Sequence, residues 1–234
     1  MAGISRPAVF GPLARDGLVD RVADLLSDAI IAGRIGPGER LSESTIARDL
    51  GVSRAPVREA ARLLENSGLV RYHPNRGFFV HEIDADSMLH IYELRLAVEI
   101  AAAERLVTQG LVAITLPALR ARMEGLREAA RRDGEVVGMI DADMAFHRAI
   151  CVASGNPRFV QVFDQLANET KLGLMLIGRL YDDPALLVET HAPVLMAIAS
   201  GDAAATTAAL KYHIGTARDL VPTMMREAKL QRTQ

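Results

Sequence analysis

The chain has 234 residues, half of them hydrophobic, and a formal net charge of −2 at pH 7, which allows one large domain or two modest ones and excludes a globally basic coat for nucleic acid. Its single cysteine, Cys151, excludes an intramolecular disulfide and a cysteine-based metal cluster within one chain, and fits a reducing cytoplasm. The N-terminus lacks the pattern of a signal peptide, and no apolar run approaches the roughly 18 residues of a membrane span, so no membrane contact is expected.

The first part of the chain predicts three helices after a short arm. Residues 1–14 are rich in Pro, Gly and Ala and show no period, so we expect a flexible arm. Apolar residues at helical spacing predict a helix over 18–32. A Ser before each of the next two apolar-periodic segments predicts helices over 42–50 and 53–66, separated by a turn at Gly51.

Two short strands are predicted next, over 69–72 and 78–80, joined by a turn that contains Pro, Asn and Gly. Three helices followed by a hairpin form the plan of a winged helix-turn-helix, which we place at 15–80. Residues 81–87 are expected to be a linker.

The rest of the chain, 88–228, has helical period throughout and no strand pattern. The predicted fold class is therefore mainly α: an N-terminal winged helix-turn-helix followed by an all-α helical-bundle domain. Its helices are predicted near residues 86–108, 115–132, 135–154, 157–180, 184–199 and 203–227.

Charge is distributed unevenly between these two parts. The first 80 residues contain 11 Arg, no Lys and 9 acidic residues, a net charge of +2, whereas the remainder is net negative. The excess of positive charge in the first part falls around the predicted third helix. This helix begins with Ser53, Arg54 and Ala55 and has Arg58 one turn later. In a helix-turn-helix the N-terminal side chains of this recognition helix enter the major groove, where Arg can pair with phosphate or guanine.

This segment closely resembles the GntR family of bacterial regulators. The resemblance implies DNA binding, with Arg54 and Arg58 as the main operator contacts. Ser53, Ala55 and Pro56 are expected to flank these contacts at the groove. Arg48, Arg34 and Arg76 are second-rank candidates for DNA contact, with Arg76 at the tip of the wing beside Gly77. Two departures from the family, Ser44 and Ala55, affect the expected base preference. The resemblance rests on Gly33, Arg34, Pro37, Gly38, Glu39, Arg40, Leu41, Glu43, the run Gly51 to Arg54, the run Pro56 to Ala60, and Gly68, Leu69 and Val70.

The helical part resembles the FCD-type effector domain of the FadR-like branch of that family, over about residues 86–220. The similarity rests on Tyr92, Glu93, Leu94, Arg95, Glu99, the run Asp143 to Ile150, Gly155, Asn156, Pro157, His191, Ala197, Ile198, Gly201, Asp202 and His213.

Four polar residues of this part are expected to point inward. Asp143 and His147 are four residues apart on one apolar helix face, and His191 and His213 lie among apolar neighbours on two further helices. Buried polar groups are costly when unpaired, so the set is either a hydrogen-bonded cluster or the site of a divalent ion such as Zn, Ni or Mn. The family pattern favours the metal. Pro193 is expected to kink or interrupt the helix and to change the direction of His191.

Arg95 is also expected to face inward, where it needs an anion. Glu99 one turn away, another acid, or the carboxylate of a bound metabolite can supply that charge; the resemblance implies the metabolite. Asn168 and Lys171 are weaker candidates for the same cavity. The histidines His73, His81 and His90 are expected at the surface or in the linker.

These expectations predict a repressor that binds double-stranded operator DNA as a homodimer, with an affinity set by a small carboxylated effector beside the metal. Two alternatives stay open. The cation itself can be the effector, or the metal can serve a metal-dependent enzyme, against which no nucleophile and base pair is found.

Overall fold

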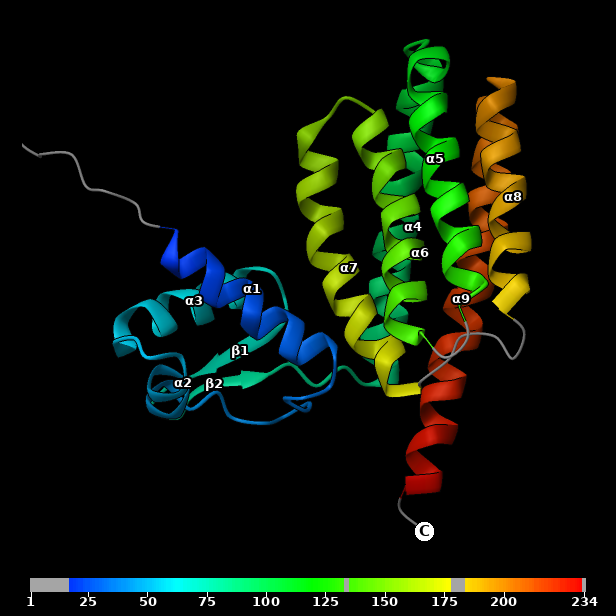
Figure 1. Cartoon of the computed structure of the whole chain (residues 1–234). Coiled ribbons are helices and arrows are strands. Elements are labelled where there is room, and N and C mark those ends of the chain that lie inside the picture. Colours follow the sequence, from blue (N-terminus) through cyan, green and yellow to red (C-terminus); the bar gives the residue numbers. More distant parts are fainter. Residues whose placement is uncertain (1–16, 133–134, 178–183, 233–234) are drawn as a thin grey trace, which may run out of the picture.

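The computed structural model describes residues 17–132, 135–177 and 184–232. Within these residues, nine helices and a two-stranded sheet form a winged domain and a helical domain that lie side by side (Figure 1). The predicted arm lies outside the described residues. The elements are α1 Leu18–Ile31, α2 Glu43–Leu50, α3 Arg54–Asn66, β1 Val70–His73, β2 Gly77–Val80, α4 Ala85–Thr108, α5 Val112–Ala130, α6 Val136–Ala153, α7 Pro157–Ile177, α8 Pro184–Ser200 and α9 Ala203–Arg232.

The winged domain has the predicted three helices and hairpin. The hydroxyl of Ser42 accepts a hydrogen bond from the Thr45 amide at 3.4 Å and caps α2, and Gly51 ends that helix with a φ of 67°. This left-handed turn, which glycine adopts without strain, sends the chain into α3. One face of α3 is buried against α1, α2 and β1, through Val57, Ala60, Ala61 and Leu64.

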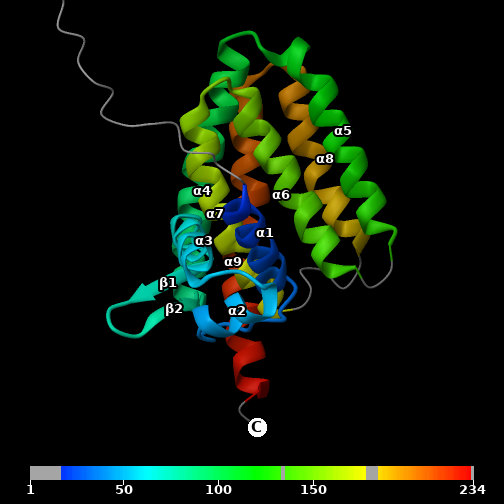
Figure 2. The ribbon, with the colours of Figure 1, turned by 60° about the vertical axis from the view of Figure 1, so that its left-hand side comes forward.

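The helical domain is a bundle of α4 to α9, as predicted. Helix α4 begins at Ala85, inside the predicted linker, because Asp84 caps it by accepting from the Ser87 amide at 2.7 Å. At the other end, α9 continues to Arg232, past the predicted end near residue 227. Helix α7 lies next to the winged domain in both views (Figures 1 and 2). Among the described residues, no helix is both long and apolar enough to cross a bilayer.

The predicted interruption at Pro193 is not observed. Helix α8 runs unbroken through this residue. Pro193 lies on the exposed side of the helix, where solvent can reach the carbonyl that loses its amide partner. His191 on the buried side therefore keeps the direction that the helix gives it.

Candidate DNA-reading surface and candidate metal centre

The start of α3 presents the predicted DNA-binding residues to solvent. Ser53 is the N-cap residue, but its hydroxyl makes no capping hydrogen bond, so it is available to a ligand. Arg54, Ala55 and Arg58 are exposed, and Pro56 is half-buried in the first turn. The exposed amides and the dipole at this helix start favour an anion such as a phosphate.

The arginines of this surface form at most weak, solvent-exposed ion pairs. Arg54 lies 3.3 Å from the Glu43 carboxylate and Arg48 lies 3.0 Å from that of Asp49. Both arginines are largely exposed, so each ion pair contributes little and exchanges readily for a phosphate. Arg58 makes no ion pair within the part of the chain that the structure describes.

The remaining predicted DNA contacts lie at the edges of the same domain. Arg34 is exposed in the turn after α1. Arg76 lies at the tip of the hairpin, where its guanidinium is 5.0 Å from the centroid of the Phe79 ring. Gly77 follows with a φ of 92°, a conformation that favours glycine. The structure thus brings the wing tip and α3 into one domain but leaves Arg34 at its periphery.

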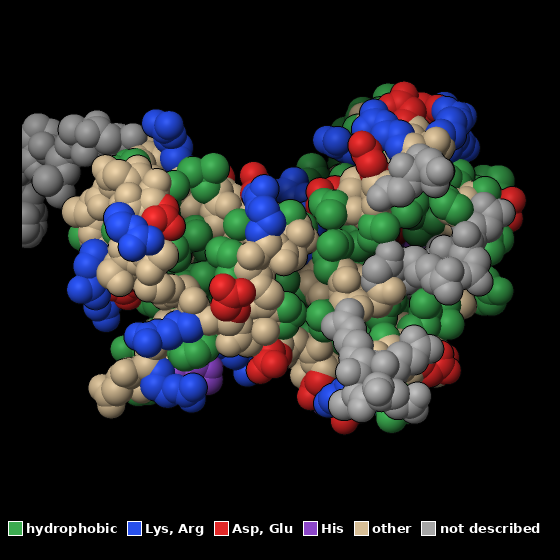
Figure 3. Space-filling model, turned by 60° about the horizontal axis from the view of Figure 1, so that its bottom comes forward, with side chains coloured by type: hydrophobic (Ala, Val, Ile, Leu, Met, Phe, Trp, Pro, Cys, Tyr) green, Lys and Arg blue, Asp and Glu red, His purple; other side chains and the backbone are tan. Residues whose placement is uncertain are grey.

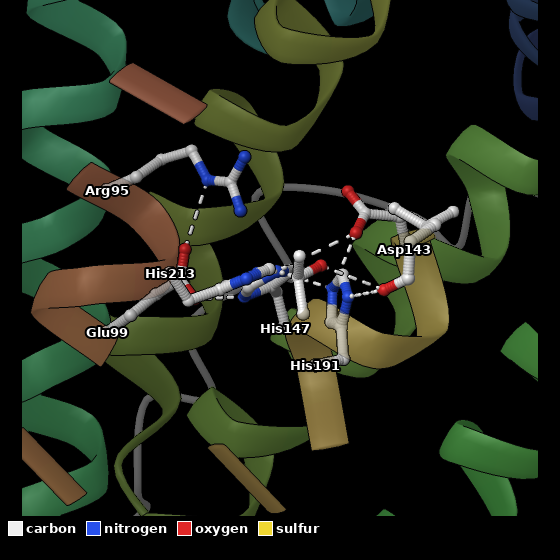
Figure 4. Close-up of polar contacts among 8 residues, drawn as sticks. Arg95, Glu99, Asp143, His147, His191 and His213 are labelled. Atoms are coloured by element: carbon white, nitrogen blue, oxygen red, sulfur yellow. Dashed lines mark hydrogen bonds and ion pairs between the residues drawn. The ribbon is translucent and has the colours of Figure 1, made fainter. Parts of the chain in front are cut away.

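The four predicted metal ligands come together in the helical domain. His147 from α6, His191 from α8 and His213 from α9 are buried, and one nitrogen of each lies within 4.8 Å of the others. The Nε2 atoms of His191 and His213 both lie 3.2 Å from Nε2 of His147. Asp143 completes the group with Oδ1 at 2.7 Å from Nε2 of His191 (Figure 4).

The hydrogen bonds behind these rings determine which nitrogens face the centre. Nδ1 of His147 donates to Glu99 Oε2 at 2.5 Å, and Nδ1 of His191 donates to the Leu187 carbonyl at 2.6 Å. In the neutral rings each proton is then on Nδ1, so both Nε2 atoms direct lone pairs at one another and at the Asp143 carboxylate. Converging acceptors repel each other unless a cation lies between them.

A divalent metal fits this arrangement. Two ligands each about 2.1 Å from a zinc ion lie roughly 3 to 3.5 Å apart, which matches the 3.2 Å separations of the Nε2 atoms. A carboxylate behind a ligating imidazole, as Glu99 stands behind His147, orients the ring and increases its basicity. A self-satisfied polar cluster fits less well, because Nε2 of His191, whose ring proton is on Nδ1, faces the Asp143 carboxylate at 2.7 Å with no proton to share.

The pKa directions agree with neutral imidazole and ionised carboxylate ligands. Burial holds the pKa of His213 well below its usual value, so this ring is neutral at neutral pH. In the cluster without an ion, burial alone would raise the pKa of Asp143, but a protonated His191 beside it would lower that pKa; a cation held by neutral rings would have the same effect. Both groups therefore offer lone pairs rather than protons at neutral pH.

Arg95 is buried at the edge of the cluster and is paired. Its Nε donates to Glu99 at 3.0 Å, and its guanidinium faces the rings of Tyr92 and Phe163. Burial disfavours the charge of Glu99, but the electrostatic attraction of His147 and of the Arg95 guanidinium, which both donate hydrogen bonds to it, outweighs that effect and lowers its pKa. Figure 4 shows Arg95 and Glu99 on one side of the histidines and Asp143 on the other. Of the partners expected for Arg95, the structure contains Glu99.

The cavity at this cluster is only about 10 Å³ and is lined by Arg95, Asp143 and the three histidines, with Tyr92, Leu187, Ile214 and Ala217. It has room for an ion or about one water. Asn168 and Lys171 do not reach it. The Asn168 amide donates to the Ser67 carbonyl at 3.2 Å, and Lys171 lies 2.5 Å from Asp141 Oδ1.

His81 lies in the linker, as predicted, but its burial was not expected. His73 and His90 are exposed, as predicted, but His81 is buried where the two domains meet. Its Nδ1 lies 3.1 Å from the Gly68 carbonyl and 4.0 Å from Glu169 Oε1 of α7. Sequence reasoning missed this contact because periodicity describes the faces of helices and strands, not the burial of a residue between two domains.

Comparison with known proteins identifies the family. Residues 18–80 match the model of the bacterial regulatory proteins of the gntR family, and residues 90–216 match that of the FCD domain. The chain belongs to the GntR family of transcriptional regulators. The two matches cover the winged domain and most of the helical domain.

Individual relatives agree with this assignment. The chain is 34% identical to the uncharacterized HTH-type regulator YdhC of Bacillus subtilis over 131 residues, 56% of this chain and 58% of that protein. It is 27% identical to the gluconate operon transcriptional repressor of Bacillus subtilis over 86% of this chain and 84% of the repressor. The solved structure of McbR/YncC of E. coli has a TM-score of 0.72 and 25% identity, over 87% and 96% of the two chains. The fold and relatives are those of transcriptional regulators rather than enzymes.

Proposed function

We propose that this protein is a homodimeric repressor whose affinity for operator DNA depends on a metal ion and a small carboxylate bound in the helical domain. The start of α3 would read the major groove through Arg54 and Arg58, and a dimer would supply two such readers for a palindromic site. The gluconate operon repressor among the relatives supports the repressor role.

The observation that carries the ligand-dependent part is the convergence of lone pairs on one buried point. Asp143, His147, His191 and His213 would hold the ion, which would supply positive charge; an ion that takes more than four ligands, such as Ni or Mn, would also accept an oxygen of the carboxylate. Arg95 would add a second anchor for a carboxylate. Its Nε is bonded to Glu99, and no other hydrogen bond of its guanidinium is formed with the described residues.

Binding of an organic acid requires movement of the helices around the cluster, because the present cavity of about 10 Å³ is too small for it. A ligand that binds the enlarged arrangement better shifts the population toward it. Binding of such a ligand would therefore change the positions of the helices, as the function of a sensor domain requires.

Helix α7 is the element that we expect to transmit this movement. It is tied to α6 by Lys171 and Asp141, two residues before Asp143. On its other side the Asn168 amide donates to the carbonyl of Ser67, the C-cap residue of α3. A shift of α6 can therefore reach the end of the recognition helix through packed and hydrogen-bonded groups.

A second candidate function treats the metal alone as the effector. The small cavity favours this reading, because it admits an ion without any rearrangement. In that case metal loading would change operator affinity in the absence of any organic acid.

One titration tests both. The operator duplex, selected from random DNA with the full-length protein, is titrated with metal-stripped and metal-reloaded protein, with and without a panel of small hydroxy- and keto-carboxylates. A change of fivefold or more in operator affinity that requires both the metal and the acid, and that is lost in Arg95→Gln, supports the carboxylate sensor. A change with metal alone supports the second candidate. Equal affinity under all conditions contradicts both.

A further inference from the structure

A cavity of about 570 Å³ lies where the winged domain, the linker and the helical domain meet. Its walls come from the segment after α1, the linker, the first turn of α4 and the later turns of α7 and α9, and include Pro37, Ile83, Asp86, Ile177 and Met225. None of the four candidate metal ligands lines it. Spaces of this size between domains are common sites for small ligands. This space, the junction cavity, is therefore a candidate ligand site distinct from the metal centre.

Part of the lining of the junction cavity is apolar. Ile83 and Met225 are buried, and Leu176 and Ile177 in the last turn of α7 are half-buried. An apolar group that enters the cavity would remove its own apolar area, and that of these side chains, from water, which is favourable. The lining therefore favours a ligand with an apolar body over a fully polar one.

The lining also contains three acidic side chains and two basic ones, so its formal charge is negative. Arg226 donates a hydrogen bond to Asp86 at 2.8 Å. Hydrogen bonds at the start of α4, and then the positive charge of Lys229, lower the pKa of Asp84. Glu82 is left without a hydrogen bond or ion pair in the part of the chain that the structure describes. The unmatched charge of the junction cavity is therefore the Glu82 carboxylate.

The position of the Glu82 side chain depends on the glycine at residue 38. Gly38 has a φ of 72°, and a Cβ built there would lie 2.9 Å from Cδ of Glu82 and 3.0 Å from its Oε1. The carboxylate therefore lies against the backbone of the turn beside Pro37. Glu82 is also exposed, so a cation from solvent can reach it. In Figure 3 acidic side chains lie where the winged half of the molecule meets the helical half.

We infer that the junction cavity binds a small organic cation, with an ammonium group on an apolar body. The ammonium group pairs with the Glu82 carboxylate, and the apolar body packs against Ile83, Ile177 and Met225. A carboxylate ligand of the same size would face the unmatched negative charge instead, which disfavours it. The inference goes beyond the proposed function, because this ligand needs neither the metal centre nor Arg95. Since the walls come from both domains, the bound cation contacts both at once.

The test follows the methionine methyl groups of the full-length protein by NMR, because Met225 lines the cavity. The probes are hexylammonium and 2-phenylethylammonium, with hexanol and hexanoate as the neutral and anionic matches of the first. We expect both ammonium probes to cause a saturable shift of the Met225 signal, which is identified by its loss in Met225→Leu. The signal of the exposed Met196, outside the cavity, should not move. Hexanol and hexanoate should bind at least tenfold more weakly than hexylammonium.

Two variants locate the site. Glu82→Gln should weaken hexylammonium binding at least tenfold without changing the melting temperature of the free protein, and Ala228→Trp, which fills the cavity, should abolish binding. The matched control Glu93→Gln, at an exposed position of α4 outside the cavity, should bind as the wild type does.

Any of three results overturns the inference: no saturable shift of the Met225 signal in the wild type, equal affinity for hexanoate, or full affinity in Glu82→Gln. The measurement contains no operator DNA, and protein stripped of metal should give the same result. Failure of this inference is therefore distinguishable from failure of the proposed function.

Discussion

The arginines at the start of α3 and the polar side chains of the candidate metal centre are two groups of charged or titratable residues, but solvent reaches only the first group. Arg54 and Arg58 are exposed, and only Arg54 forms an ion pair among the described residues, a weak one, so both can be replaced without affecting the fold. Arg95, Glu99 and His147 are buried and depend on one another. The comparison teaches that a change in the first region should affect binding alone, whereas a change in the second should affect binding and stability together.

The largest effect should follow from Glu99→Ala. The variant leaves Arg95 buried without its charge partner and removes the acceptor behind His147. We expect the free energy of unfolding to fall by about 3–5 kcal/mol, measured by urea denaturation. Glu93→Ala, an exposed position on the same helix, is the control and should change it by less than about 0.5 kcal/mol. Equal losses in both variants would contradict the central role of Glu99.

Arg58→Ala should show the opposite behaviour. Loss of a guanidinium from the recognition helix should weaken operator binding by about 1–3 kcal/mol, measured by fluorescence anisotropy at fixed salt, with an unchanged melting temperature. Arg62→Ala, one turn further along α3 and paired with Glu59, is the matched control. If Arg62→Ala weakens binding as much as Arg58→Ala does, the N-terminal turn of α3 is not the reading surface.

A smaller effect is expected at the contact between the domains. Asn168→Ala removes the hydrogen bond to the Ser67 carbonyl, a loss of about 0.5–1.5 kcal/mol in unfolding free energy. The factor by which metal loading or acid changes operator affinity should shrink, while the affinity of the unloaded protein stays the same. The control is Gln161→Ala on the exposed side of α7. A full response in Asn168→Ala would show that α7 does not transmit the signal through this contact.

The smallest effect should be a pH dependence of stability at His81. Burial, followed by the positive charge of Arg71, lowers the pKa of His81 in the folded protein, so the unfolded chain binds more protons as the pH falls below about 6.5. Stability from neutral His81 is therefore present above that pH and is lost below it. Melting temperatures of wild type and His81→Gln at pH 7.5 and 5.5 should show a steeper decline for the wild type. Parallel declines would contradict this role.

Much of the fold could be predicted from sequence because its signals are local. Gly51 and Ser53 mark the turn and cap that begin α3, and helical period places Asp143 and His147 on one buried face. Both signals depend only on residues within a turn of each other. The interruption expected at Pro193 did not occur, because a local rule about proline does not include the solvent available to the helix surface.

The features that could not be predicted from the sequence depend on contacts between segments that are far apart in the chain. Glu99 and His147 are 48 residues apart, and Asn168 and Ser67 are 101 residues apart. No pattern in one sequence joins such pairs. Asn168 and Lys171, expected only as weaker candidates for the cavity, do not line it, and the burial of His81 required both domains in position.

The central claim is that a metal ion bound by Asp143, His147, His191 and His213 completes the helical domain. Elemental analysis of the purified wild-type protein, after reloading with Zn, Ni or Mn and removal of excess ion, tests it most directly beside His213→Ala and the exposed control His90→Ala. We predict close to one ion per chain in the wild type and His90→Ala, and a large loss in His213→Ala. No bound ion in the reloaded wild type, or equal content in all three proteins, would contradict the account.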